Sequence, residues 1–149
     1  MSLKILNEIK FSFPGNSCNE SLARSVVSSF SAQLDPSVSE LGEIKTAVSE
    51  AVTNCIVHAY RGMLGKVEIT ARHLDGNVLY IKIRDNGCGI ADIKQAMEPL
   101  YTSAPEEERA GLGFAVMESF MDKVSVRSTE GKGTTVIMKR KILSGRSDT

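Results

Sequence analysis

Two segments in the first half of the chain repeat apolar residues every three or four positions, which is the spacing of an amphipathic helix. The first begins at Asn19, which can cap a helix, and runs to about Gln33, before Asp35-Pro36 breaks the pattern. The second runs from about Ser37 to Tyr60. Its apolar stripe consists of Leu41, Ile44, Val48, Ala51, Val52, Cys55 and Ala59. The pattern therefore predicts two consecutive helices.

Apolar and polar residues alternate in five shorter segments, which predicts strands because strand side chains point to opposite faces in turn. The strands are expected at residues 5–13, 66–74, 78–84, 123–128 and 134–141. Between them, residues 85–112 are predicted to be irregular and functional, with a lid at about 96–112. Within the lid, an early proline and three acids at residues 104–108 indicate the start of a short helix, and a further helix is expected from Gly113 to Met121. Strands that come in hairpins predict an α+β fold with a mixed, mostly antiparallel sheet and helices on one face.

Composition narrows the class of protein. A chain of 149 residues with 42% hydrophobic and 24% charged residues fits one domain, 1–149, with an ordinary core. Lysine plus arginine equal aspartate plus glutamate at 18 each, which argues against a nucleic-acid binder that works by bulk charge. Three separated cysteines, no long apolar run and no signal-peptide pattern lead us to expect a cytoplasmic protein without a membrane span or a structural metal.

The long helix carries a pair of polar residues, Glu50 and Asn54, whose spacing of four places them on one helix face. Both point away from the apolar stripe. A carboxylate beside a carboxamide can bind a hard cation or polarise a hydroxyl group. The same spacing also fits an ordinary solvated helix flank, and the sequence alone leaves both readings open.

Glycines follow an acid at the end of a predicted strand, in the pattern Asp85, Gly87 and Gly89. Glycine allows the backbone to approach a planar ligand closely, and the aspartate could accept a hydrogen bond from an exocyclic amine. A second pair, Gly111 and Gly113, stands before the expected helix, where free backbone N–H groups bind anions. Taken singly, these patterns also fit a plain turn and a loop end.

The order of these patterns is more specific than any one of them. Asparagine on a helix, Asp-x-Gly-x-Gly, Gly-x-Gly before a helix and then Gly131-Lys132-Gly133-Thr134 before a strand resembles the motif series of the GHKL ATPases. That superfamily includes DNA gyrase, the histidine kinases and MutL. The resemblance spans about residues 40–140 and implies a two-layer sandwich of the Bergerat ATP-binding type, with ATP and Mg²⁺ as cofactors.

Further segments resemble the sporulation anti-sigma-F factors, a family of serine protein kinases within that superfamily. They are residues 19–24, 33–36, 43–54, 99–102, 108–109 and 111–114. The resemblance implies a homodimer that holds a sporulation sigma factor inactive in its ATP state. It also implies phosphorylation of a serine on a small anti-anti-sigma protein, which the ADP form can trap.

The resemblance also implies roles for single residues in the nucleotide site. Asp85 would read the adenine amine, with Gly89 and Thr134 completing the base pocket, and Asn54 would hold Mg²⁺ against the phosphates. The other residues assigned to the nucleotide are Gly87, Thr102, Gly111, Leu112 and Gly113, with the backbone amides around the last glycines cradling the phosphates.

For transfer itself, the resemblance implies that Glu50 orients or deprotonates the serine hydroxyl and that Arg109 in the lid neutralises the transferring phosphoryl group. Arg24 would contact partner proteins, although Glu20 four residues earlier also offers a surface ion pair. Many relatives carry a lysine where this chain has Ala104. Two alternatives remain open: a binding module with an ATP site but no kinase activity, and a detached histidine-kinase catalytic domain.

Overall fold

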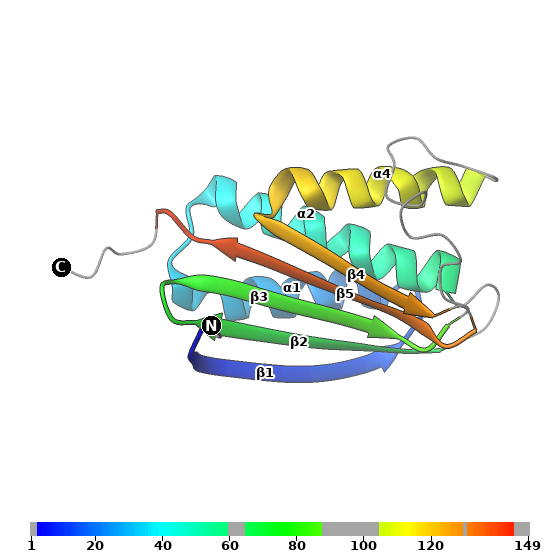
Figure 1. The fold of residues 1–149 in the computed structure, drawn as a ribbon, viewed down its shortest axis with the longest axis horizontal. Coiled ribbons are helices and arrows are strands. Elements are labelled where there is room, and N and C mark those ends of the chain that lie inside the picture. The colour runs from blue at the N-terminus through cyan, green and yellow to red at the C-terminus, as the bar shows by residue number, and fades with distance from the viewer. Residues whose placement is uncertain (1–2, 60–64, 88–104, 130, 145–149) are drawn as a thin grey trace.

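The computed structural model describes residues 3–59, 65–87, 105–129 and 131–144, which form a sheet with helices on one of its faces (Figure 1). The strands are β1 (Ile5–Pro14), β2 (Lys66–Leu74), β3 (Val78–Asp85), β4 (Lys123–Thr129) and β5 (Gly133–Lys141). They form a five-stranded sheet in the order β1-β2-β3-β5-β4, and all four pairings are antiparallel. The predicted strands are confirmed to within one residue at each end.

The helical layer packs against one face of this sheet (Figure 1). Its elements are α1 (Asn19–Ser31), the 3₁₀ turn η1 (Ala32–Leu34), α2 (Val38–Asn54), the π-helical turn η2 (Cys55–Ala59) and α4 (Pro105–Phe120). Helix α2 contacts both α1 and α4, so it is the central helix of the layer. The predicted two-layer α+β sandwich is therefore confirmed.

The core lies between the two layers. Side chains that are almost fully buried come from both sides, which include Val27, Ile44, Val48, Val52 and Met117 on the helices and Ile69, Ile81, Ile83 and Met138 on the strands. On β3, residues 79, 81, 83 and 85 are buried, and the intervening side chains point to the opposite face. Strand alternation thus directs the last residue of β3, Asp85, toward the helices.

The expected cap of the first helix is wrong. Cys18 occupies the N-cap position, and Asn19 lies in the first turn, where its Nδ2 donates to the carbonyl oxygen of Pro14 at 2.9 Å. That bond ties the start of α1 to the end of β1, because a short amide side chain finds a backbone acceptor more readily outside a helix than within it.

The extent of the last helix also differs from the prediction. Helix α4 runs unbroken from Pro105 to Phe120. The helix start expected at residues 104–108 is confirmed, but it continues into the helix expected from Gly113, so residues 109–112 are helical rather than irregular. The physical reason is a strong N-terminal signal: proline fits the first helical turn, and the three glutamates at 106–108 favour its positive dipole end. These effects outweigh the cost of the two glycines at 111 and 113, which is about 1 kcal/mol each relative to alanine.

Candidate nucleotide and phosphoryl-transfer site

A buried carboxylate closes the end of β3. Asp85 is 4% exposed, and its Oδ1 accepts hydrogen bonds from the backbone N–H of Gly87 at 2.9 Å and of Thr134 at 3.2 Å. The thiol of Cys55, at the start of η2, donates a further hydrogen bond to this carboxylate. Three parts of the chain that are distant in sequence therefore meet at Asp85.

Burial dominates the electrostatics of this pair. Removal from water raises the pKa of Asp85, although the hydrogen bonds from Gly87, Cys55 and Thr134 oppose the rise. Burial also raises the pKa of the Cys55 thiol well above its usual value, and the neighbouring Asp85 charge adds to that rise. The thiol consequently stays protonated and remains a donor.

Gly133 brings β5 against this carboxylate. Its φ is +113°, and a Cβ there would stand 2.2 Å from the Asp85 carbonyl oxygen, so only glycine fits. The close approach positions the N–H of Thr134 for Asp85. The Thr134 hydroxyl lies 2.9 Å from the Ser128 hydroxyl, which also bonds the Gly133 carbonyl at 3.1 Å. The predicted Gly-Thr motif thus lies beside Asp85, as expected.

The second predicted pair, Glu50 and Asn54, lies under α4 rather than on a solvated flank. A Cβ at Gly113 would be 3.1 Å from Glu50 Oε2 and 3.4 Å from both amide atoms of Asn54. Gly113 is buried, and with no side chain it lets α4 approach these two polar groups. Asn54 is the last residue of α2 and precedes Cys55, so both polar clusters share one end of the central helix.

The amide of Asn54 is the most informative group in the site. Its Oδ1 and Nδ2 are both buried, and within the described residues neither has a hydrogen-bond partner. A buried polar group without a partner costs about 1–3 kcal/mol, so native proteins seldom keep one without a use. An amide oxygen near a carboxylate is a ligand set that suits Mg²⁺, and these residues therefore fit the expected ion.

The remaining predicted site residues divide into two groups. Gly89 and Thr102 lie outside the described residues. Arg109, Gly111 and Leu112 lie within α4, and for Arg109 and Leu112 the structure describes the backbone alone.

One expectation about the glycines is wrong. Because α4 starts at Pro105, Gly111 and Gly113 lie in the helix interior and not at its first turn. In this structure their N–H groups are therefore not the free donors of a helix start. Gly113 instead provides space for Glu50 and Asn54.

Three features of the site had no place in the sequence prediction: the Cys55 bond to Asp85, the Gly133 contact, and the use of the Gly87 N–H by Asp85 itself. Cys55 was expected to be a core residue, and it is buried. The sequence did offer one signal for the contact between Cys55 and Asp85. Cys55 directly follows Asn54, and a helix that places Asn54 in the site directs Cys55 toward the sheet.

Arg24, the predicted partner residue, lies on α1. It forms the expected i, i+4 ion pair with Glu20 at 3.8 Å, and its side chain is 40% exposed. Glu20 also accepts a hydrogen bond from the Ser49 hydroxyl of α2. The guanidinium is therefore held on the helical layer and remains accessible to a partner.

The described residues offer neither a membrane-spanning helix nor a cluster of side chains that binds a metal by itself. None of the described helices is both long and apolar enough to cross a membrane. In the same part of the chain, no group of three or more histidine, cysteine, aspartate or glutamate side chains could hold a metal ion. A site built from Asn54 and Glu50 would thus complete its coordination with ligand oxygens or water.

Comparison with known proteins places this geometry in context. Residues 14–140 match the model of the histidine kinase-like ATPase domain. The chain is 51% identical over 144 residues to the anti-sigma F factor of Thermoanaerobacter sp. (strain X514), covering 97% of this chain and all of that one. It is 54% identical over 136 residues to the anti-sigma F factor of Caldanaerobacter subterraneus subsp. tengcongensis, covering 91% and 94%.

Solved structures show the same fold at low sequence identity. The blue-light activated histidine kinase of Erythrobacter litoralis EL346 superposes with a TM-score of 0.57 at 20% identity, covering 79% of this chain and 40% of that one. Its isolated histidine kinase domain gives a TM-score of 0.56 at 19% identity, with coverage of 87% and 65%. These likenesses support the fold of the layers described above.

Proposed function

The chain belongs to the anti-sigma F factors among the histidine kinase-like ATPases, and we propose that it is an ATP-dependent serine protein kinase that inhibits a sporulation sigma factor. The substrate is a serine on a small anti-anti-sigma protein, and the protein acts as a cytoplasmic homodimer. The observation that carries the nucleotide part of this proposal is the buried, unpartnered amide of Asn54 beside Glu50.

The arrangement suits phosphoryl transfer because that reaction needs positioning and charge compensation more than covalent chemistry. Mg²⁺-ATP, when bound, supplies the phosphoryl group. Asp85 would accept a hydrogen bond from the adenine amine, and the bonds from the Gly87 and Thr134 N–H groups hold its carboxylate in place. Asn54 and Glu50 lie side by side on α2. In this assignment Asn54 holds the metal, and Glu50 takes the proton of the serine hydroxyl.

Incubation with labelled ATP and a candidate anti-anti-sigma protein tests the reaction. Label on serine supports the proposal, label on histidine supports a detached histidine-kinase domain, and no label supports a nucleotide-gated binding module without kinase activity. Glu50→Gln should retain ATP binding and lose transfer, because it removes the base and keeps the shape. Glu43→Gln is the matched control on the same helix, since Glu43 pairs with Arg140 at 2.9 Å, away from the site.

The nucleotide pocket has its own test. Asp85→Ala should weaken ATP binding by about 1–3 kcal/mol in calorimetry, the loss expected when a buried charged acceptor is removed. Asp75→Ala, in the exposed turn between β2 and β3, is the control and should bind ATP as the parent protein does. Equal ATP affinities in all three proteins would reject the assignment of Asp85.

A further inference from the structure

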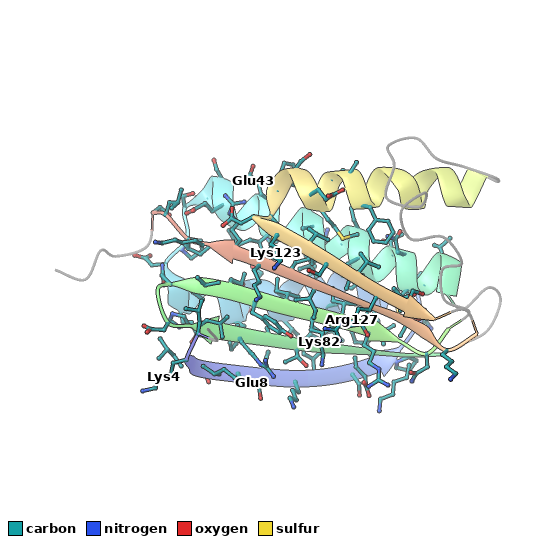
Figure 2. All side chains as sticks on the ribbon, in the orientation of Figure 1. Lys4, Glu8, Glu43, Lys82, Lys123 and Arg127 are labelled. Carbon is teal, nitrogen blue, oxygen red and sulfur yellow. The ribbon has the colours of Figure 1, made fainter. Side chains whose placement is uncertain are left out.

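The face of the sheet opposite the described helices, here called the open face, is strongly basic, although the whole chain is neutral. Strand register and alternation assign nine basic and two acidic side chains of the described strands to this open face. The basic residues are Lys10, Lys66, Arg72, Lys82, Arg84, Lys123, Arg127, Lys139 and Lys141, and the acidic ones are Glu8 and Glu68. Figure 2 looks onto this face, with Lys82 on β3 and Lys123 and Arg127 on β4 among the labelled residues.

The two acids of the open face are already engaged near β1 and β2. Glu8 pairs with Arg72 at 2.5 Å, and Glu68 pairs with Lys66 at 3.2 Å. The basic excess is therefore concentrated toward β3, β5 and β4. Like charges even stand directly opposite one another at Lys123 and Lys139, an arrangement that destabilises a sheet.

A shallow hollow of about 360 Å³ lies at the centre of this excess, and its basic lining residues are Lys82, Arg84, Arg127 and Lys132. Within the described residues none of these four makes an ion pair. Lys82 and Arg84 belong to β3, which has neighbours on both sides, so they do not serve to protect a sheet edge from aggregation.

The hollow also offers aromatic and apolar contact. Tyr80 and Ile137 line it beside the charged side chains. The Arg72 guanidinium carbon lies 4.9 Å from the centroid of the Tyr80 ring, and the Lys139 ammonium nitrogen lies 5.9 Å from it. A tyrosine next to arginines is the composition of a protein-binding surface, whose centre gains energy from aromatic and arginine side chains.

We propose that this open basic face, centred on Lys82, Arg84 and Arg127, is a docking surface for an acidic protein segment. Carboxylates would neutralise the unpaired cations and remove their mutual repulsion. A second copy of the chain cannot pack there face to face, because equal positive surfaces would meet. A long nucleic acid is disfavoured because other described parts of the surface carry exposed acidic side chains, among them Asp35, Glu118 and Asp122, which repel a polyanion.

Most of this surface lies apart from the site already described, but its hollow reaches that site, because Asp85, Gly133 and Thr134 also line it. Arg24, Glu50 and Asn54 belong to the helical layer, on the other side of the sheet. An acidic segment on the open face therefore leaves Arg24 on α1 accessible to a partner. The proposal rests on the charge distribution and does not depend on the kinase assignment.

The test is an NMR titration of the full chain with a decaglutamate peptide, followed by backbone amide shifts. Shifts centred on β3, β4 and β5 are expected, and Lys82→Glu or Arg127→Glu should weaken binding by roughly tenfold. Lys45→Glu, an equal charge change on the exposed side of α2, is the control and should leave the affinity within about twofold. Lys82→Gln repeats the test with a milder change, and circular dichroism verifies folding.

Three results would overturn the proposal. The first is a shift map spread over the helices, or equal weakening by Lys45→Glu. The second is tighter binding of a decathymidine strand than of the peptide, which would make the face a nucleic-acid surface. The third is self-association in sedimentation that Arg127→Glu abolishes, which would make it a contact between copies.

Discussion

The two ends of helix α2 both bury polar groups, but they treat them in opposite ways. At the first turn, Glu40 is 7% exposed and accepts hydrogen bonds from the N–H groups of Ser37 and Leu143, each at 2.9 Å, and from the Ser144 hydroxyl. Burial would raise its pKa, yet these bonds outweigh burial and lower the pKa to about 2. The carboxylate closes a capping box and fastens the last strand's exit to the helix.

At the last turn the balance is reversed. Burial raises the pKa of Asp85 in spite of its hydrogen bonds, and the Asn54 amide has no partner within the described residues. The difference teaches how to read buried polarity in this fold. A buried carboxylate whose hydrogen bonds are all made, such as Glu40, stabilises the fold. A buried amide without a partner, such as Asn54, next to a carboxyl with a raised pKa, such as Asp85, indicates where a ligand binds.

The largest expected effect is a loss of stability caused by a substitution next to Asp85, near the last turn of α2. Gly133→Ala should lower the free energy of unfolding by about 3 kcal/mol or more, because the new Cβ would meet the Asp85 carbonyl oxygen at 2.2 Å and φ is +113°. Gly131→Ala is the control: its φ is +81° but nothing lies within 4 Å of a Cβ, so about 1 kcal/mol is expected. Urea unfolding measures both, and equal losses would contradict the close approach.

The next effect tests the satisfied end. Glu40→Gln should cost about 2 kcal/mol of unfolding free energy at neutral pH, because a neutral amide cannot replace the carboxylate in all its hydrogen bonds. The folded pKa of Glu40 lies below its ordinary value of 4.5, so its contribution is present above that value and is lost as pH falls toward about 2. The difference between the two proteins should therefore narrow between about pH 5 and pH 2. A constant difference across that range would sink this account.

The sequence predicted the strand boundaries to within one residue because two independent signals agreed there. Alternating side chains set each strand's extent, and turn residues such as Gly76 and Asn77, which both adopt positive φ, set the connections. The proline and glutamates at 105–108 indicated the start of α4, but its continuation to Phe120 was not predicted, because the glycines at 111 and 113 suggested a break. The capping box of Ser37 and Glu40 was readable in the sequence and went unused.

The site was predictable in its residues and not in its contacts. The order of motifs nominated Asn54, Asp85 and Thr134, and the last two are joined by a hydrogen bond. Periodicity alone could not show that the Cys55 thiol faces Asp85, since 30 residues and a strand pairing separate them. Nor could it show Glu50 and Asn54 beneath Gly113, because helix packing decides which flank is covered.

A smaller effect sharpens the reading of Asn54. Asn54→Leu should raise the stability of the nucleotide-free protein by about 1 kcal/mol, because an unpartnered buried amide is replaced by an apolar group of similar size. The same variant should lose the thermal stabilisation that Mg²⁺-ATP gives the parent protein. Differential scanning calorimetry with and without nucleotide measures both effects.

The control for Asn54→Leu is a substitution of Asn77, an asparagine whose amide does have hydrogen-bond partners. Asn77 Nδ2 donates to the carbonyl oxygens of Leu34 and Ile142 at 3.1 and 3.2 Å. Asn77→Gly keeps the positive φ and removes these bonds, so it should lower stability. If Asn54→Leu destabilised the free protein as Asn77→Gly does, the amide would be structural and its assignment to the ligand would be wrong.

The smallest expected effect on stability concerns an exposed pair that belongs to neither end. Arg24→Ala should change the unfolding free energy by only about 0.3–0.5 kcal/mol, because its pair with Glu20 is solvent-exposed and spans 3.8 Å. Its effect on a candidate sigma factor should be larger, with retention on the immobilised protein reduced and ATP affinity unchanged. The asymmetry follows from exposure: a charge that contributes little to the fold is free to contribute to a partner. Normal sigma retention by Arg24→Ala, with Lys45→Ala as the matched surface control, would remove Arg24 from the partner surface.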